Sequence, residues 1–307
     1  MTITARSPDE ALRPKRLARK KPLRFRPRLP GRAFRDVMED RPLGGRFRAV
    51  RRIACALAWT LPCMLIQALL LLLPGPAKAR FPMIYFRTLC WLIGMRLQVV
   101  GKPAEGRVLY VANHTSWLDI PVLGAVLDTR FISKAEVGQW PLVGWVAKLG
   151  RTVFVSRARS GTAGEAKDMS SRLHGDESLV LFPEGTTSDG TRVLPFRSSF
   201  FAVAPAAHLV QPVTVVYDRM GGLPACRRDR PLFAWYGDME TGSHAWRLLR
   251  RTGTRCTVVL HEPFPPEAIP NRKAMAAEVG RLVAISAAQL RQNRPAQPLP
   301  APVHQGS

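Results

Sequence analysis

The residues of this chain best suited to chemistry are a histidine and an aspartate in one short segment. His114 and Asp119 lie five positions apart within residues 113–119, which read NHTSWLD. A carboxylate that binds one imidazole nitrogen fixes the tautomer, and the other nitrogen can then take a proton from a bound alcohol. These are two parts of a serine-hydrolase triad, but the chain has no Gly-x-Ser-x-Gly elbow, which argues against an esterase or lipase. The pair predicts an enzyme whose substrate brings its own hydroxyl.

A second motif, the segment FPEGTT at 182–187, places Glu184 70 positions after His114. It directly follows an apolar run over 179–182. Gly185 permits a tight turn and the close approach of a ligand. The Glu184 carboxylate could hydrogen-bond a polyol hydroxyl, or it could fix the loop. The sequence leaves both roles open.

The elements that must position these motifs alternate along the chain from about residue 97. We expect strands at 96–100, 107–112, 130–133, 152–156, 178–182, 211–217 and 256–260. We expect helices near 117–127, 140–149, 162–174, 198–208, 243–251 and 271–291. This order predicts an α/β fold with a mostly parallel sheet flanked by helices. Active-site loops usually lie at the carboxyl ends of such strands, which is where both motifs fall.

The charge of the chain is unusually positive, because 46 basic residues face 22 acidic ones and give a net +24. Residues 1–52 contain 17 Lys or Arg and 5 Asp or Glu, so half of the excess lies there. Such a segment could bind nucleic acid or anionic lipid. The apolar segment that follows favours anionic membrane lipids as the partner and argues against nucleic acid.

An apolar segment at 53–73 is long enough to be a membrane helix and is flanked by Arg51 and Arg52. A second apolar stretch, 81–95, is shorter, carries one arginine and is rich in aromatic residues, as interfacial helices are. The turn at 74–76, Pro-Gly-Pro, predicts that the two form a membrane-associated helical hairpin. With the basic N-terminus kept inside, the hairpin would return the chain to the cytoplasmic face of the inner membrane.

Four sequence blocks resemble those of the 1-acylglycerol-3-phosphate acyltransferase family, the PlsC-type glycerolipid acyltransferases. In the order and spacing of that family, they are Asn113-His114-x4-Asp119; Lys134-Ala135-Glu136 with Gly144-Trp145 and 150–157; 182–186; and 210–213. Together they lie within residues 108–217. Each block is only moderately specific, but the ordered set is strong.

The resemblance implies a reaction and two catalytic residues. His114 would be the general base that deprotonates the acceptor hydroxyl, and Asp119 would orient it. The hydroxyl would then attack the thioester of acyl-CoA or acyl carrier protein, with no acyl-enzyme. No metal or cofactor is expected, and the five cysteines show no metal-ligand spacing.

The resemblance also implies how the acceptor is held. Glu184, Gly185 and Thr186 match the acceptor-binding turn. Lys134 and Arg157 match basic positions near the acceptor head group. The expected domains are a basic, largely disordered segment over 1–50, membrane-associated helices over 51–96, the acyltransferase catalytic domain over 97–292 and a disordered tail over 293–307.

One departure from the family concerns the acceptor. The family often has arginine after Glu-Gly-Thr, where it helps to bind a phosphate, but this chain has Thr187. Arg192, Arg197 or Lys134 could compensate. We expect acylation of 1-acyl-glycerol-3-phosphate to phosphatidic acid, with lyso-ornithine lipid, which has no phosphate, as the alternative acceptor. A non-catalytic basic membrane-binding protein is a further alternative, against which the intact His114 and Asp119 pair argues.

Overall fold

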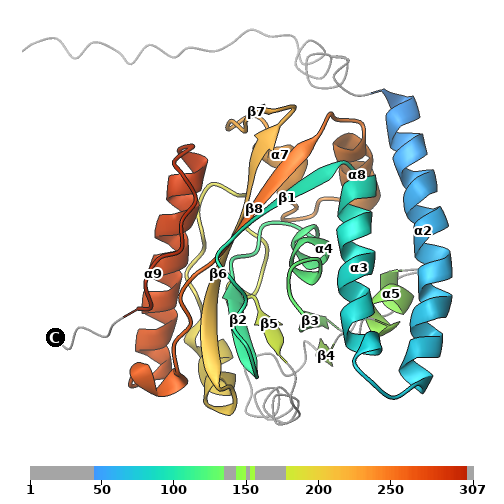
Figure 1. The fold of residues 1–307 in the computed structure, drawn as a ribbon. Helices are drawn as coiled ribbons and strands as arrows, with labels where there is room; N and C mark the ends of the chain where they lie inside the picture. The colour runs from blue at the N-terminus through green and yellow to red at the C-terminus, as the bar shows by residue number, and fades with distance from the viewer. Residues whose placement is uncertain (1–44, 135–142, 150–152, 156–177, 303–307) are drawn as a thin grey trace, which may run out of the picture. The chain divides into compact units, whose positions relative to one another are not determined.

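The computed structural model describes residues 45–134, 143–149, 153–155 and 178–302 (Figure 1). All of them belong to one structural unit, Pro42–Ser307. The helix expected near 162–174 lies outside the described residues. The centre of the unit is a single sheet of eight strands.

The strands coincide closely with the apolar runs of the sequence. They are β1 (Met95–Val100), β2 (Val108–Ala112), β3 (Arg130–Lys134), β4 (Val153–Val155), β5 (Leu179–Leu181), β6 (Leu209–Met220), β7 (Leu223–Pro224) and β8 (Thr254–Leu260). Their order in the sheet is β1-β8-β6-β2-β5-β3-β4, and β7 pairs with β6. The predicted mostly parallel α/β sheet is confirmed, because the pairs from β6 through β4 are all parallel. β8 runs antiparallel to β6, and β1 runs parallel to β8.

The central strand β2 is buried on both faces, and its side chains alternate between two apolar clusters. Val108, Tyr110 and Ala112 point to one cluster. Leu109 and Val111 point to the other, which contains residues of η4 (Ser198–Ala206) and α9 (Arg272–Arg291). In Figure 1, α9 covers one side of the sheet, while α4 (Asp119–Gly124) and the N-terminal helices lie on the other. Because β2 is packed on both faces, the position of its carboxyl end is fixed, and so is the start of the loop that contains His114.

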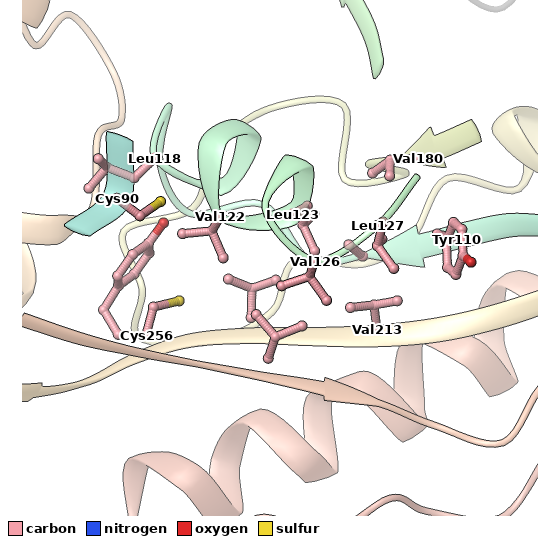
Figure 2. Packing of buried hydrophobic residues seen from close by; sticks show 14 of the residues in the cluster. Cys90, Tyr110, Leu118, Val122, Leu123, Val126, Leu127, Val180, Val213 and Cys256 are labelled. Carbon is pink, nitrogen blue, oxygen red and sulfur yellow. The ribbon is translucent and has the colours of Figure 1, made fainter. Parts of the chain in front are cut away.

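The short helix α4 packs its apolar side chains into the cluster that contains Val108, Tyr110 and Ala112. Figure 2 shows Val122 and Val126 directed toward the strand that bears Val213, with Leu118 and Leu127 at the ends of the same segment. Burying such side chains stabilises the fold by roughly 1.5–3 kcal/mol each. Asp119 is the first residue of α4, so this packing also sets the position of the aspartate.

The two apolar segments near the N-terminus form the expected hairpin. They are α2 (Arg46–Leu72) and α3 (Ala77–Leu92), with the Pro-Gly-Pro turn between them. The Trp59 indole donates to the carbonyl oxygen of Tyr85 (3.2 Å), and Thr60 and Tyr85 share a hydrogen bond (3.1 Å). Among the described helices, α2 alone is long and apolar enough to cross a membrane.

One face of α2 is bound to the part of the chain that contains the sheet, along much of the helix. Near its start, the Arg52 guanidinium donates to the carbonyl oxygens of Leu249 (2.9 Å) and Arg251 (2.8 Å), at the end of α8 (Thr241–Leu249). Near its end, the Gln67 amide donates to the carbonyl oxygen of Leu149 (3.1 Å), the last residue of α5 (Val143–Leu149). The opposite face exposes a row of large apolar side chains: Leu57, Leu61, Leu65, Leu69 and Leu72.

Two segments differ from the sequence prediction. The helix expected near 198–208 is the 3-10 helix η4; Pro205 has no N–H with which to donate an α-helical bond. Residues 293–302, expected to be disordered, have no regular secondary structure but pack on the domain. The Leu299 N–H donates to Nδ1 of His261 (3.0 Å), and its carbonyl accepts from Glu262 N–H (3.1 Å). Apolar contacts of Leu299 and Ala301 with the η4–α9 cluster account for this order.

Candidate active site

The two predicted catalytic residues are in contact. His114 lies two residues beyond the end of β2, and Asp119 begins α4. The Nδ1 atom of His114 is 2.8 Å from Oδ2 of Asp119. Since Asp119 accepts the Nδ1 hydrogen, Nε2 is left as the basic nitrogen. The histidine side chain is 20% exposed and the aspartate is fully buried, so the base can meet a substrate while its partner cannot.

The Asp119 carboxylate is held by the protein from both sides. Oδ2 also accepts the backbone N–H groups of Thr115 (2.7 Å) and Ser116 (2.9 Å). Oδ1 accepts the hydroxyl of Tyr217 at 2.6 Å. Burial, and then the nearby Asp119 charge, raise the pKa of Tyr217 well above its usual value, so the phenol remains a donor. A carboxylate with these donors cannot rotate away from His114.

The imidazole is further restrained by the second motif. The His114 ring stacks on the Phe182 ring, with centroids 4.1 Å apart and planes inclined by 20°. Oε1 of Glu184 accepts the His114 N–H (2.7 Å), and Oε2 accepts the Leu194 N–H (2.9 Å). The Ser188 N–H donates to the carbonyl oxygen of His114 (2.9 Å). Both oxygens of Glu184 therefore tie loops together.

Burial raises the pKa of Glu184 to about 7, even though two backbone N–H groups favour its charged form. The next residue, Gly185, has φ +70°, which favours glycine. A Cβ at this position would lie 3.4 Å from the guanidinium of Arg197. Thr186 is exposed and Thr187 is half-buried beside this turn.

The predicted head-group cations are less fully described. Lys134 is the last residue of β3, but its side chain is outside the described part of the structure. Arg157 lies outside the described residues altogether. Arg192 and Arg197, named as possible substitutes for the missing arginine at 187, are exposed on the loop that follows the turn.

Some contacts that shape the site gave no signal in the sequence. Tyr217 reaches Asp119 from 98 positions away, on a different strand. The Asn113 side chain exchanges two hydrogen bonds with the backbone of Val215, of 2.9 and 2.8 Å. The Trp117 indole donates to Nδ1 of the buried His244 (3.1 Å), and burial lowers the pKa of that histidine, so it stays a neutral acceptor. No local spacing could have revealed these contacts.

A pocket lies next to the histidine–aspartate pair, beyond the carboxyl end of β2 and along residues 215–218 of β6, although neither member of the pair lines it. Its enclosed part is small, with a volume of about 50 Å³, and it opens to solvent. Thr115 and Tyr217, both bound to Asp119, form part of its wall. Arg230 and Arg291 also line it. In open α/β sheets, ligands bind at this edge.

Known proteins share both the sequence and the fold. A model of the Acyltransferase family matches residues 96–217. A lyso-ornithine lipid O-acyltransferase of Brucella abortus is 42% identical over 242 residues, 76% of this chain and 91% of the relative. A 1-acyl-sn-glycerol-3-phosphate acyltransferase of Neisseria gonorrhoeae is 33% identical over 49% of this chain and 58% of the relative.

Among solved structures, the acyltransferase PlsC from Thermotoga maritima has the same fold, with a TM-score of 0.62 and 18% identity. The match covers 82% of this chain and 97% of that protein. These findings confirm the resemblance seen in the four sequence blocks. The chain belongs to the PlsC-type glycerolipid acyltransferase family and is an O-acyltransferase of lipid biosynthesis.

Proposed function

We propose that this enzyme is a lyso-ornithine lipid O-acyltransferase. It would transfer a fatty acyl group from acyl-CoA or acyl carrier protein to the hydroxyl on the acyl chain of lyso-ornithine lipid. The observation that carries the proposal is the 42% identity over 91% of a relative with that activity. Thr187, at a position where phosphate-binding members often have arginine, points the same way. The sequence alone favoured lysophosphatidic acid, and the level of identity supports the alternative acceptor.

In the proposed mechanism, Nε2 of His114 takes the proton of the acceptor hydroxyl as its oxygen attacks the thioester carbonyl. The 2.8 Å contact from Nδ1 to Asp119 supports this role, because the carboxylate stabilises the imidazolium that forms. When the tetrahedral intermediate collapses, the carbon–sulfur bond breaks and His114 returns the proton to the thiolate. The products are an ester and a free thiol, and the enzyme is unchanged.

We further propose that the hairpin of α2 and α3 inserts into the cytoplasmic face of the inner membrane without crossing it. Arg52 and Gln67 both bind the catalytic domain, and because they are 15 positions apart, the helix between them spans roughly 22 Å. A helix attached to the domain over that distance could cross only by drawing the domain into lipid. Its exposed leucine face would instead rest among the acyl chains, and the basic N-terminal segment would bind anionic head groups.

The test is an acyl-transfer assay with purified protein, both labelled donors and both acceptors in separate reactions. We expect product from lyso-ornithine lipid at a rate well above that from lysophosphatidic acid. The same protein carrying His114→Ala provides the control for contaminating activities. Product from lysophosphatidic acid alone would overturn the proposed acceptor, and product retained by the alanine variant would overturn the proposed base.

A further inference from the structure

The pocket beside the catalytic pair contains two arginines that come from distant parts of the chain. Arg230 begins α7 (Arg230–Phe233), and Arg291 ends α9. Neither belongs to the four blocks that define the family resemblance. We propose that Arg230 and Arg291 bind an anionic group in the head group of the acceptor, which is the ornithine carboxylate if the proposed function holds.

The position of the pocket fits an acceptor whose hydroxyl must reach His114. Thr115 is bonded to His114 in the chain and shares its aspartate partner. The segment that contains Arg230 is fastened to the same loop, because Trp235 N–H donates to the carbonyl oxygen of Thr115 at 3.0 Å. Gly190, from the loop after the second motif, completes the same wall. A head group in this pocket would therefore lie next to both catalytic loops.

The charges in the pocket favour an anion. Its one acidic lining residue, Asp218, is already bound by the Arg255 guanidinium through both carboxylate oxygens. Arg291 donates to the carbonyl oxygen of Thr191 (3.3 Å), which holds its guanidinium in place. Burial, and then repulsion from Arg230, lower the pKa of Arg291, against the opposite effect of the Glu184 and Asp189 carboxylates. Because the two arginines repel one another, an anion bound by both would stabilise them.

The planar guanidinium matches a carboxylate particularly well, since each can form two parallel hydrogen bonds. Ornithine that is acylated on its α-amino group keeps a free carboxylate close to the acyl chain that bears the hydroxyl. A phosphate would satisfy the same two arginines. The experiment must therefore separate the two kinds of acceptor.

The decisive experiment compares Arg230→Gln and Arg291→Gln with the control Arg228→Gln, an exposed arginine of the same loop that does not line the pocket. Each protein is given lyso-ornithine lipid and its carboxamide, in which the negative charge of the carboxylate is removed and the ammonium group is kept. Thermal unfolding checks that each variant is folded. Arg291→Lys, which keeps the charge but not the fork, provides a second substitution at that position.

For the wild type, we expect kcat/KM to be roughly ten- to a hundredfold lower with the carboxamide, as for the loss of charge-assisted hydrogen bonds. In each glutamine variant, kcat/KM for lyso-ornithine lipid should fall by a similar factor, because the KM of the acceptor rises. With the carboxamide acceptor, kcat/KM should change little. Arg228→Gln should behave as wild type. Unchanged kinetics in both glutamine variants, or a rise confined to the KM of the acyl donor, would overturn the proposal.

The proposed function can fail separately, if wild-type enzyme forms no product from lyso-ornithine lipid. The variants would then be assayed with lysophosphatidic acid and with uncharged monoacylglycerol. If Arg230→Gln and Arg291→Gln no longer prefer lysophosphatidic acid over monoacylglycerol, the result would support an anion-binding site in the pocket. A preference equal to that of the wild type would refute it.

Discussion

The hydroxyl of Tyr217 offers the sharpest test of how the catalytic aspartate is held. Among the described residues, it is the donor to Oδ1 of Asp119, while the donors from the catalytic loop all reach Oδ2. Tyr217→Phe leaves the ring, which stacks on Phe233 with centroids 5.5 Å apart and planes 9° apart. The substitution therefore removes one hydrogen bond and leaves a buried, charged oxygen unpaired.

A hydrogen bond to a charged group contributes about 1.5–3 kcal/mol. For a domain of this size, each kcal/mol corresponds to about 2–4 °C, so we expect Tm to fall by about 3–12 °C. Since the carboxylate can then turn, we also expect kcat to fall roughly tenfold, with little change in the KM of either substrate. Calorimetry and initial rates on detergent-purified protein measure both quantities. The matched control is Tyr236→Phe, at a half-buried tyrosine that makes no contact with Asp119. If both variants show the same Tm and kcat, the Tyr217 bond does not hold the aspartate.

Three further predictions follow from the site and the core. His114→Ala should lower kcat by roughly a hundredfold or more, whereas His208→Ala, at an exposed histidine, should not; equal rates in initial-velocity assays would refute the role of the base. Burial raises the pKa of Glu184 from 4.5 to about 7, so between these pH values the folded state keeps a proton that the unfolded state has lost. The free energy of unfolding should therefore fall as pH rises from about 4.5 to 7, by at most about 1.4 kcal/mol per pH unit. In denaturant titrations across this range, the free energy of unfolding of Glu184→Gln should depend less on pH than that of the wild type. An equal dependence on pH would show that Glu184 is not the group that titrates. Gly124→Ala would place a Cβ 2.4 Å from a ring carbon of Phe86 in α3, so the free energy of unfolding should fall by about 1–3 kcal/mol. The control Gly253→Ala, where a Cβ would meet open space, should change little. Equal stability of the two variants in denaturant titrations would show that α3 and α4 can move apart.

The sequence predicted most of the sheet because the relevant signals are local. Runs of β-branched and aliphatic residues bounded by glycine, proline and polar residues identified β1, β2, β3, β4, β5, β6 and β8 within a few residues. Strands buried on both faces give such runs without alternation. β7, with two residues, and α7, with four, are too short to give a pattern. The described part of the tail packs through apolar contacts of a few scattered residues, Ala296, Leu299 and Ala301, which its composition obscured.

The candidate site was predictable only where its residues are close in sequence. His114 and Asp119 are five residues apart in one loop and helix start, so their contact depends on local geometry. The place of Glu184 beside them depends on β2 and β5 being neighbours, and its two backbone contacts show that it holds the loops in position. Tyr217 and the two pocket arginines are brought in by the tertiary fold. The absence of arginine at position 187 was visible in the sequence, but the meeting of Arg230 and Arg291 in one pocket was not.

The position of β1 in the sheet has a consequence for the time course of biosynthesis. Met95 pairs with Thr254, which is synthesised 159 residues later. At about 5–20 residues per second, a ribosome needs roughly 8–32 s to make the partner strand. The apolar hairpin just before β1 is therefore complete and available to lipid while the neighbouring sheet edge is still open. We expect membrane attachment to precede closure of the sheet, so a nascent chain that misses the membrane would expose an apolar hairpin and an unpaired strand together.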